Sequence, residues 1–249
     1  RSEHAEDLNR ISDGMSAAVE EQLKSERLRT ELITNVSHDI KTPLTSIINY
    51  VDLLEKTHPE DETVRAYLDV LSRQSTKLKK LIEDLIEASK AAVGSLPVHP
   101  EPCDLTILMQ QVLGEYAERL EGSGLTSVVY CPEEPVMILA DGRHMWRILD
   151  NLMNNICKYA QQGTRVYLSL EKDKGNALMT FRNISREELN ISAEELTERF
   201  TRGDSSRNTE GNGLGLAIAD SLTKLQGGQM KLTLDGDLFK VQLQFPLRA

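Results

Sequence analysis

The N-terminal part of the chain repeats apolar positions in steps of three and four, which predicts helices buried along one side. The first run carries Leu8, Ile11, Met15, Ala18, Leu32, Val36, Ile40, Leu44, Ile47, Val51 and Leu54. A second run, expected from about Asp61 to Ala92, carries Val64, Leu68, Leu71, Leu78, Leu81, Leu85 and Ala88. Between them, Thr57–Asp61 is a predicted turn, because Pro59 disfavours helix at His58.

Two antiparallel helices with one-sided apolar stripes cannot bury both faces by themselves. The simplest arrangement that covers the remaining apolar face is a homodimer, in which two such hairpins form a four-helix bundle.

A different pattern begins after the segment Gly94–Pro102, which has three prolines in six residues and is predicted to be a linker over 95–102. Helices are expected at Asp104–Glu121, at Asp141–Ala160 with Asp141 as N-cap, and at Leu214–Gln226. Strands are expected near Leu125–Cys131, Val136–Ala140, Thr164–Leu170, Ala177–Arg182, Met230–Leu234 and Leu238–Phe245. Strands interleaved with helices predict an α/β layer domain with its helices on one face. The expected organisation is α+β: a helical region at 1–94, the linker at 95–102 and an α/β domain at 103–249.

Composition narrows the class of protein. Apolar residues make up 39% and charged residues 27% of the 249, which is typical of a folded globular chain. The net charge of −10 argues against nucleic acid as the main partner, since phosphates require a basic surface. Three cysteines, Cys103, Cys131 and Cys157, form no CxxC pair and are predicted to be free thiols rather than a disulfide framework or zinc site.

No apolar run approaches the roughly 20 residues that a membrane helix needs. The chain begins at Arg1 and not at a methionine. We therefore expect it to be a fragment of a longer protein; the family resemblance described below implies that it is the cytoplasmic portion of a membrane protein.

The first predicted helix contains a candidate nucleophile, His38, followed directly by Asp39. A neutral imidazole can attack phosphorus, and a neighbouring carboxylate can take the other ring proton. Pro43 removes the amide that would bond to the carbonyl of Asp39, so a bend is expected there. A His-Asp pair alone is more often a solvated helix face. However, the order His-Asp-x-x-Thr-Pro-Leu from His38 to Leu44 resembles the phosphoacceptor box of sensor histidine kinases, which usually has Glu in place of Asp39.

A second candidate site lies on the helix expected at Asp141–Ala160. Asn151, Asn155 and Lys158 are spaced to share one helical face, beside an apolar stripe that ends at Tyr159. Amide oxygens can ligate Mg²⁺ and a lysine can meet phosphate. The stretch Asn151–Tyr159 resembles the asparagine box of the same family.

A third candidate is the glycine-rich run Gly211-Asn212-Gly213-Leu214-Gly215, which leads directly into a helix. Glycines let the backbone approach a ligand closely, and a helix N-terminus offers free amides to an anion. The stretch Glu198–Arg207 before it resembles the family's phenylalanine box, with Arg202 and Arg207 as candidates to neutralise phosphate charge.

One motif departs from the family. Where Asp-x-Gly-x-Gly is common, this chain has Asn183-Ile184-Ser185-Arg186-Glu187. Asn183 keeps an oxygen that can accept the adenine N–H, but without a charge, and the missing glycines are expected to make the pocket rim stiffer or differently shaped. The following Leu189–Arg199 is expected to form a short lid helix.

The resemblance implies a two-component sensor histidine kinase with an ATP-binding sandwich of the GHKL ATPase type, shared with DNA gyrase. It further implies that ATP, with Mg²⁺ held by Asn155, phosphorylates His38, and that the phosphate then passes to an aspartate of a response regulator. Asp39 would accept the ring proton, and Thr42 would orient water for the dephosphorylation of the regulator. The implied nucleotide-binding residues are Asn151, Asn155, Lys158, Tyr159, Asn183, Arg202, Arg207, Gly211, Gly213, Leu214 and Gly215.

Two other functions are compatible with parts of the sequence. A degenerate kinase that only binds or dephosphorylates a regulator is supported by the Asn183 departure alone. An ATP-driven clamp would share the asparagine and glycine motifs but has no reason to carry the His38 motif on a bundle helix.

Overall fold

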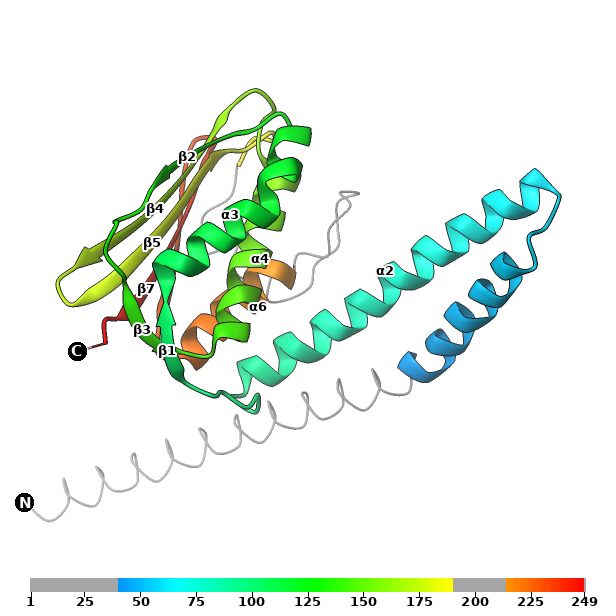
Figure 1. The fold of residues 1–249 in the computed structure, drawn as a ribbon, viewed down its shortest axis with the longest axis horizontal. Coiled ribbons are helices and arrows are strands. Elements are labelled where there is room, and N and C mark those ends of the chain that lie inside the picture. The colour runs from blue at the N-terminus through cyan, green and yellow to red at the C-terminus, as the bar shows by residue number, and fades with distance from the viewer. Residues whose placement is uncertain (1–39, 190–213, 249) are drawn as a thin grey trace, which may run out of the picture. The chain divides into compact units, whose positions relative to one another are not determined.

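The computed structural model describes residues 40–189 and 214–248 (Figure 1). The chain divides into two compact units, residues 1–93 and residues 94–249. Asp39, beside which a bend was predicted, lies outside the described residues. Of the lid helix expected at Leu189–Arg199, only Leu189 is described. Outside the described residues lie six candidate site residues, His38, Asp39, Arg202, Arg207, Gly211 and Gly213.

The first unit is a helical hairpin, as predicted. A helix runs over residues 40–56, and α2 spans Glu62–Ala92. His58 lies in the intervening turn in the left-handed conformation, with φ of 49°. Asp61 caps α2 by accepting a hydrogen bond of 2.7 Å from the Thr63 amide, which satisfies one of the free donors of the first turn.

The hairpin buries only a small part of its predicted apolar stripe. The buried residues are Leu44, Val51, Leu68, Ser75, Ile82 and Ala91. Seven members of the predicted stripe have 38% to 52% of their surface exposed, namely Ile40, Ile47, Leu54, Val64, Leu71, Leu78 and Leu85. Of the described part of the predicted stripe, only Leu44, Val51 and Leu68 are therefore buried by the packing of the hairpin itself. An ion pair of 3.6 Å between Lys41 and Glu83 also joins the two helices.

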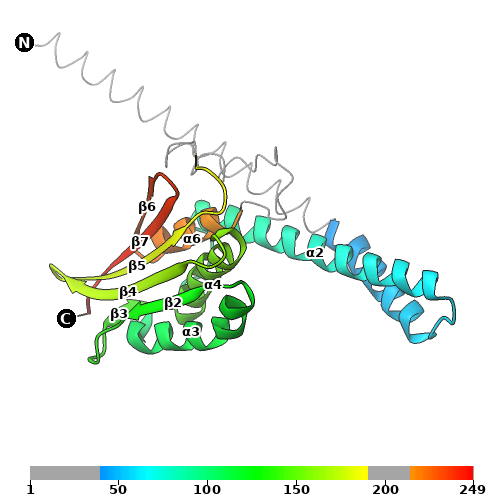
Figure 2. The same cartoon turned by 90° about the horizontal axis from the view of Figure 1, so that it is seen from above.

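The second unit is the predicted α/β domain. Its elements in chain order are β1 (Glu101–Asp104), α3 (Leu105–Gly122), β2 (Thr126–Tyr130), β3 (Met137–Ala140), α4 (Gly142–Tyr159), β4 (Arg165–Asp173), β5 (Asn176–Ile184), α6 (Leu214–Leu225), β6 (Gln229–Asp235) and β7 (Leu238–Pro246). Five strands form one sheet in the order β2-β4-β5-β7-β6, in which only β2 and β4 are parallel. The helices α3, α4 and α6 lie together on one face of this sheet (Figures 1 and 2).

The core of this unit lies between that sheet face and the helices. Alternate residues of the central strands are buried, and so is the apolar stripe of α4, namely Met145, Ile148, Leu149, Leu152, Met153 and Ile156. Gly228 is required beside this core, because a Cβ there would lie 2.4 Å from the ring of Phe245. The cysteines are free thiols, as predicted.

The structure corrects the predicted linker at its C-terminal end. Glu101 and Pro102 belong to β1, which pairs with β3 in a separate two-stranded sheet. The prolines favoured a linker, but a strand at a sheet edge tolerates a residue without an N–H. In addition, β4 and β5 extend beyond the predicted limits through a tight hairpin, where Lys174 and Gly175 have φ of 46° and 81°.

Among the helices of the described ranges, none is long and apolar enough to span a bilayer.

Candidate functional site

Asp141 anchors the helix that carries the asparagine motif. Its carboxylate, only 3% exposed, accepts hydrogen bonds from the amides of His99 at 3.1 Å and Arg143 at 3.0 Å. Its own amide donates to Gln226 Oε1 at 2.7 Å. Burial by itself would raise the pKa of Asp141, but the hydrogen bonds from His99 and Arg143 outweigh it and lower the pKa to about 2. An ionised Asp141 therefore ties the start of α4 to the segment before β1 and to the end of α6.

The predicted polar face of α4 is present, and its three residues are partly exposed. Asn151 Nδ2 donates to the carbonyl of Arg147, one turn earlier, at 2.8 Å. Asn151 Oδ1 lies 3.1 Å from the place where a Cβ on Gly215 would stand. The first turn of α6, with Leu214 and Gly215, is therefore packed directly against Asn151.

The last turn of α4 is joined to the end of β5 by backbone hydrogen bonds. The amide of Arg186 donates to the Tyr159 carbonyl, and the amide of Gln161 donates to the Ile184 carbonyl, both at 2.8 Å. The Arg186 guanidinium adds a bond of 3.2 Å to the Lys158 carbonyl. Burial raises the pKa of Tyr159, with the charge of Glu187 as a second cause. Because of these bonds, Lys158 and Tyr159 lie beside the residues that follow Asn183.

Asn183 ends the row of buried residues that β5 directs toward the helices. It follows Ala177, Met179 and Phe181 at alternate positions and is itself only 4% exposed. Its Nδ2 donates to the Ile184 carbonyl at 3.3 Å. Its Oδ1 is buried without a hydrogen-bond partner among the described residues. A buried acceptor of this kind costs about 1–3 kcal/mol unless a donor reaches it, so the atom is suited to an N–H group of a ligand.

These observations place seven of the predicted residues in one region of the second unit. Asn151, Asn155, Lys158 and Tyr159 come from α4, Asn183 from the end of β5, and Leu214 and Gly215 from the start of α6. Within the described ranges no group of three His, Cys, Asp or Glu residues is placed to hold a metal ion. The amide oxygen of Asn155 has the chemistry of a Mg²⁺ ligand.

Thr42 belongs to the helical unit. It is exposed on the helix over residues 40–56, one residue before Pro43.

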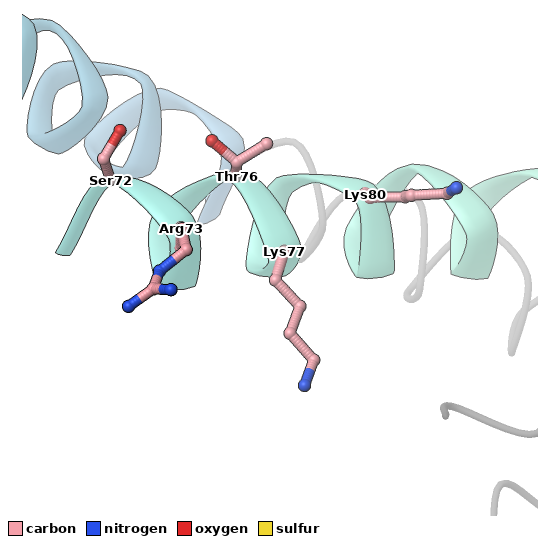
Figure 3. A pocket seen from close by; sticks show the side chains of 5 residues that line it. All are labelled: Ser72, Arg73, Thr76, Lys77 and Lys80. Atoms are coloured by element: carbon pink, nitrogen blue, oxygen red, sulfur yellow. The ribbon is translucent and has the colours of Figure 1, made fainter. Parts of the chain in front are cut away.

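Sequence reasoning did not single out a basic pocket on α2. The pocket has a volume of about 440 Å³ and is lined by Ser72, Arg73, Thr76, Lys77 and Lys80 (Figure 3). Arg73 and Lys77 extend to one side of the helix, and the hydroxyls of Ser72 and Thr76 point to another. The spacing of the three basic residues, which places them on neighbouring turns of one helix, was the signal that could have revealed it.

Comparison with known protein families agrees with this architecture. The family model of the His Kinase A (phospho-acceptor) domain matches residues 28–94. The model of the Histidine kinase-, DNA gyrase B-, and HSP90-like ATPase matches residues 140–249. The second unit thus has the fold of an ATP-binding domain of this class.

Curated relatives and solved structures narrow the family to which the chain is assigned. Histidine protein kinase SaeS of Staphylococcus aureus is 30% identical over 93% of this chain and 68% of its own length. Sensor protein DivL of Caulobacter vibrioides is 28% identical over 91% of this chain, which spans only 28% of DivL. The structure of full-length ShkA in complex with AMPPNP superimposes with a TM-score of 0.74, at 23% identity, over 88% of this chain and 46% of that one. The chain belongs to the sensor histidine kinases of two-component systems.

Proposed function

We propose that this chain transfers the γ-phosphoryl group of ATP to His38 and then to an aspartate of a response-regulator receiver domain. The observation that carries the nucleotide part is Asn183 Oδ1, which is buried and has no hydrogen-bond partner in the part of the chain that the structure describes. We propose that the adenine base is oriented so that its amino group donates the missing hydrogen bond to Asn183 Oδ1. The AMPPNP in the ShkA structure supports a nucleotide of this type.

The residues around Asn183 have complementary roles toward the rest of the nucleotide. The first amides of α6, at Leu214 and Gly215, face the phosphates as a helix N-terminus does for an anion. Lys158 adds positive charge, and Asn155 holds Mg²⁺, which neutralises charge on the phosphates. Asn151 sets the distance between α4 and α6 through its contact with Gly215. Arg202, Arg207, Gly211 and Gly213, outside the described residues, are proposed to complete the phosphate site.

The proposed transfer needs a neutral imidazole that carries its proton on Nδ1. His38 Nε2 attacks the γ-phosphorus, the new N–P bond forms as the bond to the β,γ-bridging oxygen breaks, and ADP leaves. Asp39 takes the Nδ1 proton. Positioning and charge neutralisation supply most of the acceleration in such phosphoryl transfers. In the reverse activity, Thr42 orients the water that hydrolyses the phosphorylated regulator.

The exposed members of the apolar stripe support a homodimer. In each helix the exposed members repeat every seven residues, for example Val64, Leu71, Leu78 and Leu85. A second hairpin packed on this face completes a four-helix bundle of the usual kind.

The basic pocket on α2 supports docking of the receiver domain. Lys77 and Lys80 line the pocket on exposed turns of the helix. The carboxylate that receives the phosphate is itself acidic, so positive charge on the bundle favours its approach. We place the reaction on the cytoplasmic side of the membrane, where ATP and soluble receiver domains are present.

Labelling tests the proposal directly. The whole chain is incubated with γ-labelled ATP and Mg²⁺, and the protein-bound label is expected to be acid-labile and base-stable. His38→Ala is expected to abolish it, and His99→Ala, which removes an exposed imidazole, is expected to retain it. Label that persists in His38→Ala would refute the assignment, and free phosphate without any phosphoenzyme would indicate an ATPase clamp.

A further inference from the structure

The connection between the two units is short and is fixed at several points. The chain leaves the first unit after Val93, the C-cap of α2, and turns at Gly94, which has φ of 69°. Glycine adopts this left-handed conformation readily, so the direction in which the chain leaves α2 is set there. Pro97 and Pro100 each hold φ near about −65°, which stiffens the rest of the connection before β1.

Two hydrogen bonds fasten this connection to the start of α4. His144 Nε2 donates to the Pro97 carbonyl at 3.0 Å, so the imidazole carries a proton on that nitrogen. Two residues later, the His99 amide donates to Asp141 Oδ2 at 3.1 Å. His144 Nε2 lies 4.0 Å from the same carboxylate oxygen, and only 14% of the His144 side chain is exposed. Pro97, His99, Asp141 and His144 thus form one set of contacts within the second unit, which we call the linker clamp.

The linker clamp shortens the connection between the units. With the clamp closed, only residues 94–96 separate Val93 from Pro97, which allows a reach of about 14 Å at most. With the clamp open, the connection extends to the start of β1 at Glu101, and the maximum reach doubles to about 28 Å. The effective concentration of one tethered group around another falls with roughly the −3/2 power of the tether length, so this doubling lowers it about three-fold.

We propose that His144 is a positioning residue for phosphoryl transfer, because it keeps the connection short while ATP bound to the second unit reacts with His38 of the first. The inference rests on the proposed kinase function. In this role His144 does not contact the nucleotide and acts only through the Pro97 carbonyl. Loss of the linker clamp therefore lowers the rate of transfer from bound ATP and leaves the affinity for ATP unchanged.

Two substitutions of His144 and one matched control test this role. His144→Ala removes the donor, whereas His144→Gln is the rescue variant, because its side-chain amide N–H can donate to the Pro97 carbonyl. His99→Ala is the control, since the clamp uses the backbone amide of His99 and not its exposed imidazole. The initial rate of acid-labile labelling at saturating γ-labelled ATP with Mg²⁺, and the dissociation constant for ATP by calorimetry, are measured on the whole chain. We expect a rate about three-fold lower in His144→Ala, the wild-type rate in the other two variants, and one dissociation constant in all four proteins.

A labelling rate at or above that of the wild type in a folded His144→Ala would overturn the inference and leave the kinase function intact. An equally low rate in His144→Gln, or weaker ATP binding in His144→Ala, would also overturn it. If His144→Ala does not fold, hydrogen exchange of the His99 amide in the wild type decides: protection supports the clamp, and exchange as fast as in an unstructured peptide overturns it. If the wild type binds no ATP and His38 acquires no label, the proposed function fails and the inference fails with it.

Discussion

Replacing Asp141 by Asn tests whether the buried carboxylate is what fixes α4 in place. Asn keeps the shape and can still cap a helix, but it carries no charge. The pKa of Asp141 lies at about 2, below its ordinary value of 3.8. One pKa unit corresponds to about 1.36 kcal/mol, so the ionised carboxylate contributes about 2 kcal/mol to the free energy of unfolding at pH 7. We expect Asp141→Asn to lower the stability of the second unit by about this amount.

The pH dependence of the unfolding free energy tests the role of Asp141 independently. Because the pKa of Asp141 is lower in the folded state, its contribution is complete above about pH 4 and is lost as the pH falls toward 2. The difference in unfolding free energy between wild type and Asp141→Asn is therefore expected to be constant at neutral pH and to shrink between these limits.

Urea unfolding followed by the fluorescence of Trp146 provides the assay. Trp146 is the one tryptophan of the chain and lies on α4, so the signal reports the second unit specifically. Asp173→Asn, at an exposed position at the end of β4, is the matched control and should change stability little. Equal stability of wild type and Asp141→Asn at pH 7, or curves that stay parallel down to pH 2, would refute the reasoning.

Three further substitutions test other parts of the molecule. Gly215→Ala places a Cβ 3.1 Å from Asn151 Oδ1 and should weaken ATP binding in calorimetry by about ten-fold. In the control Gly122→Ala the new Cβ meets nothing within 4 Å, so the affinity should not change. Equal affinities of the two variants would contradict the packing argument. Lys77→Glu should slow phosphotransfer to the receiver domain by about ten-fold while autophosphorylation stays at the wild-type rate, and an unchanged transfer rate would remove the α2 pocket from the docking surface. Leu78→Glu should shift the chain toward monomer in sedimentation without changing the Trp146 unfolding curve, and an undiminished dimer would exclude this face as the dimer interface.

Elements with a strong apolar period were predicted to within a few residues. The helix α4 was expected at Asp141–Ala160 and spans Gly142–Tyr159, since its stripe and its cap agree. β1 was not predicted, because Pro102 is unfavourable in most strands. The strand is recognised only from the pairing of β1 with β3, in which Pro102 lies opposite Leu139. The strand pair β4 and β5 was predicted too short, because polar residues near Lys174 continue the ladder into a hairpin that a hydrophobic pattern does not register.

The residue type of Asn183 could be read from the sequence, whereas its surroundings could not. Its residue type and its place after a strand already indicated an acceptor for adenine. Its burial, and the absence of a partner for Oδ1 within the described ranges, follow from the packing of β5 and from the bond between Nδ2 and the Ile184 carbonyl, which no local pattern encodes.

The helical hairpin shows most clearly what a pattern leaves open. The stripe of α2 was predicted as one apolar face, yet the structure divides it into two sets. Leu68 is buried, whereas Leu71 and Leu78 have 49% and 44% of their surface exposed. A single partner helix can cover only a narrow seam, so a stripe that is wider than one seam requires a second partner. The homodimer expected from the sequence thus acquires a specific interface, because the exposed set is the one that a second copy of the hairpin would bury.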